Sequence, residues 1–185
     1  MQMDRVEFLK VFKAFTEETM ADLILPTRVQ KASEEQEYRV PEVYLMRLPD
    51  SKSATKKAPY ILHQLITGTD VQEQGTDVAS SIVVRSIFCA YSADEQEGAL
   101  MLLNMAERLR IALLRRCAVG DRNQFALDLS QKIEFLAYPD DTAPYYAGEM
   151  ITTWWMPPVS REMTYVWHEN QTLRSVPTSG LRFGV

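Results

Sequence analysis

Residues 80–117 read SSIVVRSIFCAYSADEQEGALMLLNMAERLRIALLRRC and contain a strand followed directly by a long helix. We expect the helix at about 93–117, because Ser92 is a good N-cap and Glu95 stands three residues later, the spacing of a capping box. Acidic residues fill its first turn and arginines its later turns, as the helix dipole favours. Gly120 is the expected stop. Apolar side chains at helical spacing predict one buried face, made of Ala99, Leu102, Leu103, Ala106, Leu109 and Leu113.

The strand at 80–91 is apolar on both sides. One parity presents Ile82, Val84, Phe88 and Ala90, and the other presents Val83, Ile87, Cys89 and Tyr91. A strand wetted on one face alternates apolar and polar residues, and this one hardly does. We therefore expect both faces to be covered, one by a helix and the other by the N-terminal helix or a neighbouring subunit.

The remaining elements are predicted from the spacing of apolar residues and from the positions of proline and glycine. Apolar spacing predicts an amphipathic helix over 3–23, ended by Pro26. A strand within 38–48 must lie at a sheet edge, because Pro41 cannot donate to a ladder. A buried strand is expected at 59–67, followed by a polar turn in which Gly-Thr-Asp-Val occurs twice, at 68–71 and 75–78.

The last strands complete the predicted sheet. Residues 125–137 are either one long bent strand or two short ones, and the first interpretation is favoured; 145–156 form a returning strand. The fold class is α+β, with a mixed, mainly antiparallel sheet of about four to five strands packed by an N-terminal helix and one long central helix. Residues 1–158 are expected to form a single domain. Residues 159–185 are expected to be an extension that docks on a neighbour or partner.

Composition limits the classes of function. The chain has 185 residues, 46% hydrophobic and 24% charged, with a net charge of -5, which argues against non-specific binding to nucleic acid or membranes. The basic loop at 49–58 favours a solvated hairpin tip over a nucleic-acid contact. Cys89 and Cys117 are interpreted as reduced, buried residues of a cytoplasmic protein. The N-terminus has no signal-peptide pattern, and no apolar stretch approaches the about 20 residues of a membrane helix.

A search for catalytic chemistry finds no constellation. His63 lies in an apolar strand, where a structural imidazole is favoured over a catalytic or ligand role, and His168 is far away in the sequence. Asp140 and Asp141 favour an exposed turn over a cation site. No nucleophile elbow, phosphate loop or zinc spacing is present in the sequence. We therefore predict a protein that is not an enzyme and has no cofactor, metal or catalytic residue.

Some aromatic and apolar residues are instead candidates for an interface. Trp154 and Trp155 must point to opposite faces of one strand, so that one ring is in the core and the other is exposed or at an interface. The full set of candidate interface residues is Ile82, Val84, Phe88, Trp154, Trp155, Tyr165 and Trp167.

The order of elements resembles that of a known family. It runs through PYIL at 59–62, IVVRSI at 82–87, LLNMAERLR at 102–110, and YYAGEMI at 145–151 leading to Trp154-Trp155 and Pro157. This arrangement resembles the tail-completion or tail-terminator proteins of long-tailed bacteriophages and prophages, including the head-tail joining group, over about residues 59–158. The acidic loops and the tail beyond Pro158 have no counterpart in this resemblance.

The resemblance implies a virion structural protein that assembles as a closed homo-oligomeric ring, commonly a hexamer. Such a ring sits on the end of the tail tube, stops its polymerisation and meets the head connector; before assembly the protein is in the host cytoplasm. Three alternatives stay open: a head-completion or connector-adaptor protein, a small cytoplasmic ligand-binding or enzymatic domain, and a regulatory module that binds a peptide at an edge strand.

Overall fold

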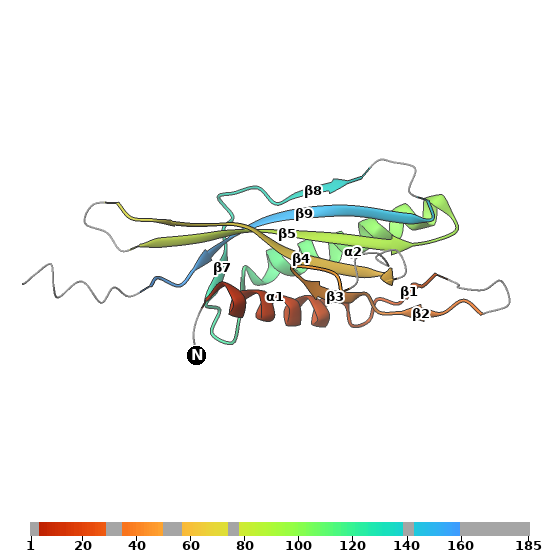
Figure 1. Cartoon of the computed structure of the whole chain (residues 1–185), viewed down its shortest axis with the longest axis horizontal. Helices are drawn as coiled ribbons and strands as arrows, with labels where there is room; N and C mark the ends of the chain where they lie inside the picture. The colour runs from red at the N-terminus through yellow and green to blue at the C-terminus, as the bar shows by residue number, and fades with distance from the viewer. Residues whose placement is uncertain (1–3, 29–34, 50–56, 74–77, 139–142, 160–185) are drawn as a thin grey trace, which may run out of the picture.

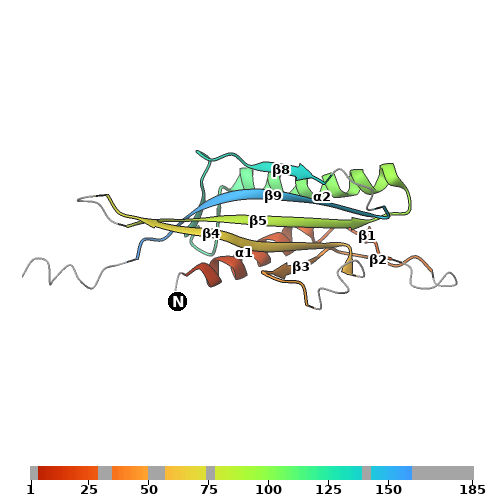
Figure 2. The same ribbon diagram turned by 45° about the horizontal axis from the view of Figure 1, so that its top comes forward.

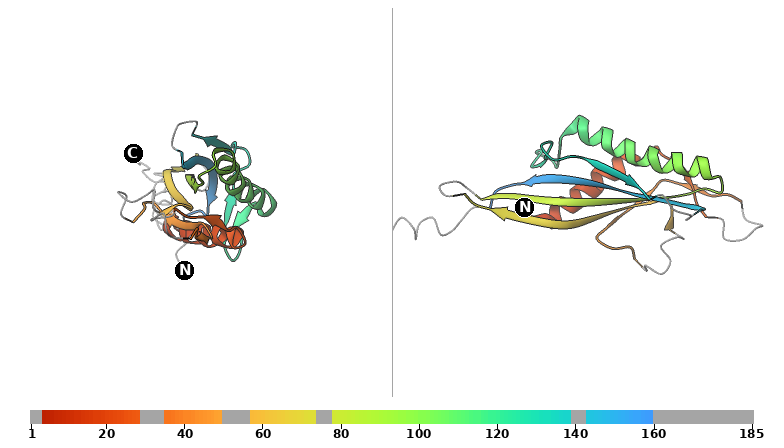
Figure 3. Two further views of the ribbon diagram at one scale, coloured as in Figure 1. Left: turned by 90° about the vertical axis from the view of Figure 1, so that its right-hand side faces the viewer. Right: turned by 90° about the horizontal axis from the view of Figure 1, so that it is seen from above.

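The computed structural model describes residues 4–28, 35–49, 57–73, 78–138 and 143–159. Two helices pack on one side of a curled, mainly antiparallel sheet, and the long strands run nearly the length of the molecule (Figures 1 and 2). The end-on view in Figure 3 shows both helices on the same side of the sheet. The α+β class predicted from the sequence is confirmed.

Within the described ranges the main sheet has seven strands, more than the four to five that were predicted. Its order is β3-β4-β5-β9-β7-β6, and β8 pairs with the same edge of β9 as β7 does. Only β3 pairs in parallel, with β4. The count is higher because the predicted strand at 125–137 divides into β7 and β8, and because the two-residue β6 was not predicted. The seven are β3 (Glu42–Leu45), β4 (Tyr60–Val71), β5 (Ala79–Tyr91), β6 (Ala118–Val119), β7 (Phe125–Leu127), β8 (Glu134–Ala137) and β9 (Tyr145–Met156).

Helix α1 (Arg5–Met20) matches the predicted N-terminal helix within a turn. The carboxylate of its N-cap, Asp4, accepts a hydrogen bond from the backbone N–H of Glu7 at 2.8 Å. The helix ends at Met20, before Pro26, which lies in β1 (Leu25–Pro26) and pairs with β2 (Tyr38–Arg39). β3 is an edge strand and begins directly after Pro41, as expected from a residue without a backbone donor.

Helix α2 (Glu95–Arg116) begins and ends differently from the prediction. Asp94, not Ser92, is the N-cap and accepts from the N–H of Glu97 at 2.8 Å. The N–H of Ser92 instead donates to the carbonyl of Pro144 at 3.0 Å, so Ser92 still belongs to the end of the strand layer. At the other end Cys117 adopts φ 55° and caps the helix, while Gly120 lies beyond it in the β6–β7 connection.

Two strand predictions also need correction. β4 continues to Val71, because residues 67–71 pair with β5 after a register shift at Ile66, so the first Gly-Thr-Asp-Val is strand and not turn. The stretch 125–137 is two short strands and not one bent strand. Asp128 separates them by accepting from the N–H and the hydroxyl of Ser130, which makes a turn between β7 and β8.

The core lies between the helices and one face of the sheet. Phe8 and Phe12 of α1 pack against Trp154 of β9, with ring centroids 5.1 and 5.3 Å apart. Leu102 and Leu109 of α2 belong to the same buried cluster. In β5 the even-numbered residues point into this core, and all of them from Ser80 to Ala90 are buried. The prediction of one helix-covered face is confirmed.

Candidate interaction surfaces

The sheet has an open face, made of the odd-numbered residues of β5 and β9 and their partners on β4. Along β5, Val83, Arg85 and Ile87 are only half-buried, whereas their even-numbered neighbours are buried. Both helices pack on the opposite face. The predicted second cover of β5 is therefore only partial among the described residues, and the open face divides into three zones.

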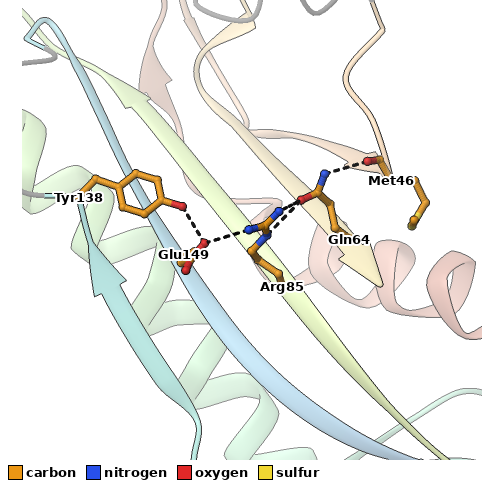
Figure 4. Close-up of polar contacts among 5 residues, drawn as sticks. All are labelled: Met46, Gln64, Arg85, Tyr138 and Glu149. Carbon is orange, nitrogen blue, oxygen red and sulfur yellow. Dashed lines mark hydrogen bonds and ion pairs between the residues drawn. The ribbon is translucent and has the colours of Figure 1, made fainter. Parts of the chain in front are cut away.

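The middle zone is a row of hydrogen-bonded polar side chains, called here the polar row: Gln64, Arg85, Glu149 and Tyr138. Arg85 donates from Nε and Nη2 to Gln64 Oε1 at 3.1 and 2.7 Å, and its Nη1 lies 3.7 Å from Glu149 Oε2 (Figure 4). Tyr138 donates to the same carboxylate oxygen at 2.7 Å, and Gln64 Nε2 donates to the Met46 carbonyl at 2.9 Å. The row thus crosses β4, β5 and β9 and reaches the residue after β8.

The electrostatics of the polar row follow from partial burial. Glu149 is the less exposed partner of its ion pair, at 19% against 39% for Arg85. Loss of solvent, and then the hydrogen bond to Glu149, raise the pKa of Tyr138 to about 12. Tyr138 therefore remains a donor at neutral pH. These hydrogen bonds and the ion pair hold the side chains of three strands and of Tyr138, the residue after β8, in one arrangement.

On one side of the polar row the chain covers its own open face. Tyr60, Leu62 and Cys89 are buried there with Ala58, which precedes β4, and half-buried aromatic rings of β3, β5 and β9 pack around them. Burial raises the pKa of the Cys89 thiol to about 11 and raises the pKa of Tyr60 further above its usual range. This zone is a second small core.

On the other side lies what we call the apolar patch, made of Val83, Ile151 and Trp155. Val83 sits diagonally between the other two, since it pairs with Thr153 of β9. Val83 and Ile151 are half-buried and Trp155 is 45% exposed. Apart from the indole N–H of Trp155, these three side chains have no hydrogen-bonding groups, so the patch is suited to a protein contact.

Helix α2 carries a second apolar surface, called here the outer stripe: Leu100, Leu103, Ile111 and Leu114. Their exposed fractions are 64, 45, 40 and 40%. At 100° per residue the four fall within an arc of about 80°, opposite the buried Leu102, Leu109 and Leu113. The outer stripe therefore faces away from the sheet, on the opposite side of the molecule from the apolar patch. Leu103, which the sequence placed on the buried face, belongs to it.

An ion pair interrupts the outer stripe at its middle. Arg110 donates from Nε and Nη2 to the two carboxylate oxygens of Glu107 at 2.8 and 2.7 Å. Both side chains are about two-fifths exposed, 38 and 41%. The hydrogen bond to Arg110 lowers the pKa of Glu107, so the pair is ionised.

Most of the predicted interface residues are not at the surface. Ile82, Val84, Phe88 and Trp154 are all buried at 0–1% in the chain's own core, so we correct their assignment: the helices of the same chain cover them. One ring of the tryptophan pair is exposed, as predicted, and it is that of Trp155. Tyr165 and Trp167 lie outside the described residues, as do Asp140, Asp141 and His168.

His63 is a structural residue, as predicted. It is fully buried and bonded through its two nitrogens to Ser86 and Thr16, at 2.8 and 2.9 Å. Cys89 is buried as expected, but Cys117 is only half-buried, because it caps α2. Within the described ranges no three His, Cys, Asp or Glu side chains gather as a metal site would require.

Sequence reasoning missed both the outer stripe and the polar row. The stripe had a signal, since Leu100, Leu103, Ile111 and Leu114 repeat at helical spacing on their own. The polar row also had one, because Gln64, Arg85 and Glu149 are polar interruptions of apolar strands.

Comparison with known proteins does not identify the role of these surfaces. No family model matches the chain, and no curated protein matches it. Among the described helices, neither has the length and hydrophobicity needed to cross a membrane.

Proposed function

We propose that this protein is a structural component of a bacteriophage or prophage virion that closes the tail. Copies of the chain join into a ring, commonly a hexamer, at the end of the tail tube. The ring stops polymerisation of the tube and presents a surface to the head connector. Its partners are other copies of itself, the tail tube protein and the head-completion protein, and its place in the virion is the head-tail junction.

One observation carries the proposal: the chain exposes two different apolar surfaces on opposite sides. A closed ring is built by a heterologous contact, in which one surface of each subunit meets a different surface of the next. The apolar patch and the outer stripe meet this requirement, because one lies on the open face of the sheet and the other on the far side of the helix layer.

The arrangement of the sheet supports the same proposal. A half-apolar sheet face that stays in water forgoes the free energy that its burial would supply. An exposed face of this kind therefore favours a protein partner that covers it. The resemblance of this order of elements (helix, paired long strands, long helix and returning strand) to that of tail-completion proteins supports the same proposal. The C-terminal extension at 159–185, with Tyr165 and Trp167, is a further proposed contact to a neighbour or to the tube.

The experiment is to mix the purified full chain with tail tubes that lack a terminator and to examine them by negative-stain electron microscopy. We expect a disc at one end of each tube and tubes of uniform length. Size exclusion with light scattering measures the mass of the free protein in parallel. A protein that stays monomeric at high concentration and leaves tube ends bare would contradict the proposal.

A further inference from the structure

We infer that the outer stripe of α2 in one copy of the chain packs on the open face of the sheet in the next copy. This inference rests on the proposed self-assembly and names the two surfaces that join. The partner is a second copy of this chain. The joining surfaces are Leu100, Leu103, Ile111 and Leu114 on one side, and Val83, Ile151 and Trp155 with the polar row on the other.

The first argument is that both surfaces are apolar and interrupted by one ion pair. The outer stripe has leucines before Glu107–Arg110 and Ile111 and Leu114 after it. The open face has Arg85–Glu149 in the middle, with Val83 two positions from Arg85 on one side and, two positions away on the other, the half-buried Ile87 at the edge of the second small core. An apolar–charged–apolar order on both partners lets apolar side chains meet apolar ones when the charged centres are aligned.

The second argument is charge complementarity within that alignment. Placing Glu107 opposite Arg85 puts Arg110 beside Glu149, so each charge gains a second opposite charge. Sliding the helix along the strands sets these charges against apolar side chains, where they lose solvent without a partner. The two ion pairs therefore fix the register of the contact, while the apolar side chains supply its free energy.

The third argument concerns length. From Leu100 to Leu114 the outer stripe rises through 14 residue steps of helix, or about 21 Å at 1.5 Å per residue. On the open face, Glu149 of the polar row and Trp155 of the apolar patch lie six residue steps apart along β9, or about 20 Å. The surfaces match in extent. A standard interface covers about 800 Å² per partner, so the polar side chains flanking each apolar surface must also take part.

The test uses two variants that each damage one surface. Leu103→Lys with Ile111→Lys alters the outer stripe, where both new lysines lie four residues from Glu107 and suit the helix. Ile151→Lys with Trp155→Lys alters the apolar patch, where Ile151 is cross-strand from Glu134. Lysine is used on both surfaces so that the two altered surfaces repel each other. Thermal unfolding and circular dichroism verify that each variant folds.

Analytical ultracentrifugation at high concentration then gives the result. We expect the wild type to form closed oligomers, each variant alone to be monomeric, and an equal mixture to form a heterodimer that grows no further. The heterodimer arises because the intact stripe of one variant meets the intact sheet face of the other. A third variant, truncated after Val159, is expected to associate as the wild type does.

Other outcomes overturn the inference and say what replaces it. If the patch variant alone still dimerises, stripe packs on stripe; if the stripe variant alone does, sheet packs on sheet. If truncation after Val159 abolishes association, the C-terminal segment occupies the open face. A wild type that is monomeric at high concentration overturns the pairing as well. Each result is separate from the tube-end experiment, because closed rings that ignore tubes would sink the proposed function and leave the pairing intact.

Discussion

His63 and Thr16 meet in the core, with Nε2 of the imidazole 2.9 Å from the threonine hydroxyl, although they lie 47 positions apart in the chain. Thr16 donates its only hydroxyl proton to the carbonyl of Phe12, so Nε2 of His63 is the donor and Nδ1 accepts from Ser86. The ring also packs on Phe12 at a centroid distance of 4.3 Å. One neutral imidazole thus ties α1, β4 and β5 together.

The first prediction concerns stability at low pH. Burial lowers the pKa of His63 to about 3, against 6.5 in an unfolded chain. Between these values the unfolded chain binds a proton that the folded chain does not, so the free energy of unfolding falls as pH drops below about 6.5. One such group contributes a slope of at most about 1.4 kcal/mol per pH unit. Urea denaturation from pH 7 to pH 4 measures this slope.

The matched variant for this prediction is His63→Gln, which offers polar atoms but does not titrate. It is expected to be less stable at pH 7 and to show a shallower loss of stability on acidification. Parallel pH profiles for the variant and the wild type would show that other groups cause the acid sensitivity.

The second prediction compares adjacent tryptophans. Trp154 is fully buried and donates from its indole nitrogen to Thr152 at 2.9 Å, whereas Trp155 is 45% exposed. Trp154→Ala is expected to cost about 3–5 kcal/mol of unfolding free energy, and Trp155→Ala less than about 1 kcal/mol. Chemical denaturation of the two single variants measures the difference. Equal losses would place the strand register one residue away from the one described.

The third prediction concerns the close approach of α2 and β9 at Gly98. A Cβ at this position would overlap the ring of Tyr146, so Gly98→Ala must move the ring or the helix. Alanine favours a helix by about 1 kcal/mol over glycine, yet we expect the substitution to destabilise the protein because of the overlap. Adding Tyr146→Ala should remove the overlap. A double-mutant cycle by thermal unfolding measures the coupling, and additive effects would argue against the contact.

The fourth prediction concerns thiol reactivity. Burial raises the pKa of Cys89 to about 11, while Cys117 caps α2 in a half-buried position. A thiol reagent at neutral pH should therefore modify Cys117 first and reach Cys89 only after unfolding. Cys117→Ser is expected to abolish the fast phase, and Cys89→Ser to leave it unchanged. Fast modification in the Cys117→Ser variant would mean that the second small core opens readily.

Much of the fold was predictable because its main elements are long and strongly patterned. β9 was placed at its observed bounds, since the segment is rich in β-branched and aromatic residues and is followed by Pro157-Pro158. The N-cap of α2 was misplaced because Ser92 and Asp94 are both good caps, and only a tertiary hydrogen bond to Pro144 selects between them. The short strands β6, β7 and β8 exist through pairing with neighbours, which a single strand's composition does not encode.

The interface was harder to predict than the fold. Phe88 and Val83 look equally apolar in sequence, and the difference between them arises from which side of the sheet both helices cover. The second apolar surface of α2 was visible as periodicity, but Leu103 could be assigned to either face until the helix was oriented by its contacts. Which apolar side chains are buried depends on how the helices pack on the sheet, and the pattern within one element does not contain this information.

The position of β9 has a consequence for how the chain reaches its native state. β9 is the last in sequence of the described strands, yet it lies inside the sheet, between β5 on one edge and β7 and β8 on the other. β4 and β5 are consecutive in sequence and pair as a hairpin. The chain between β5 and β9 contains all of α2, so these two strands pair across a much larger sequence separation. Until β9 pairs, β5 has an unpaired edge and the place of Trp154 in the core is empty. During synthesis that edge can therefore pair with strands of other chains. Fast pairing of β9 with β5 therefore protects this protein from joining other copies through the wrong strand.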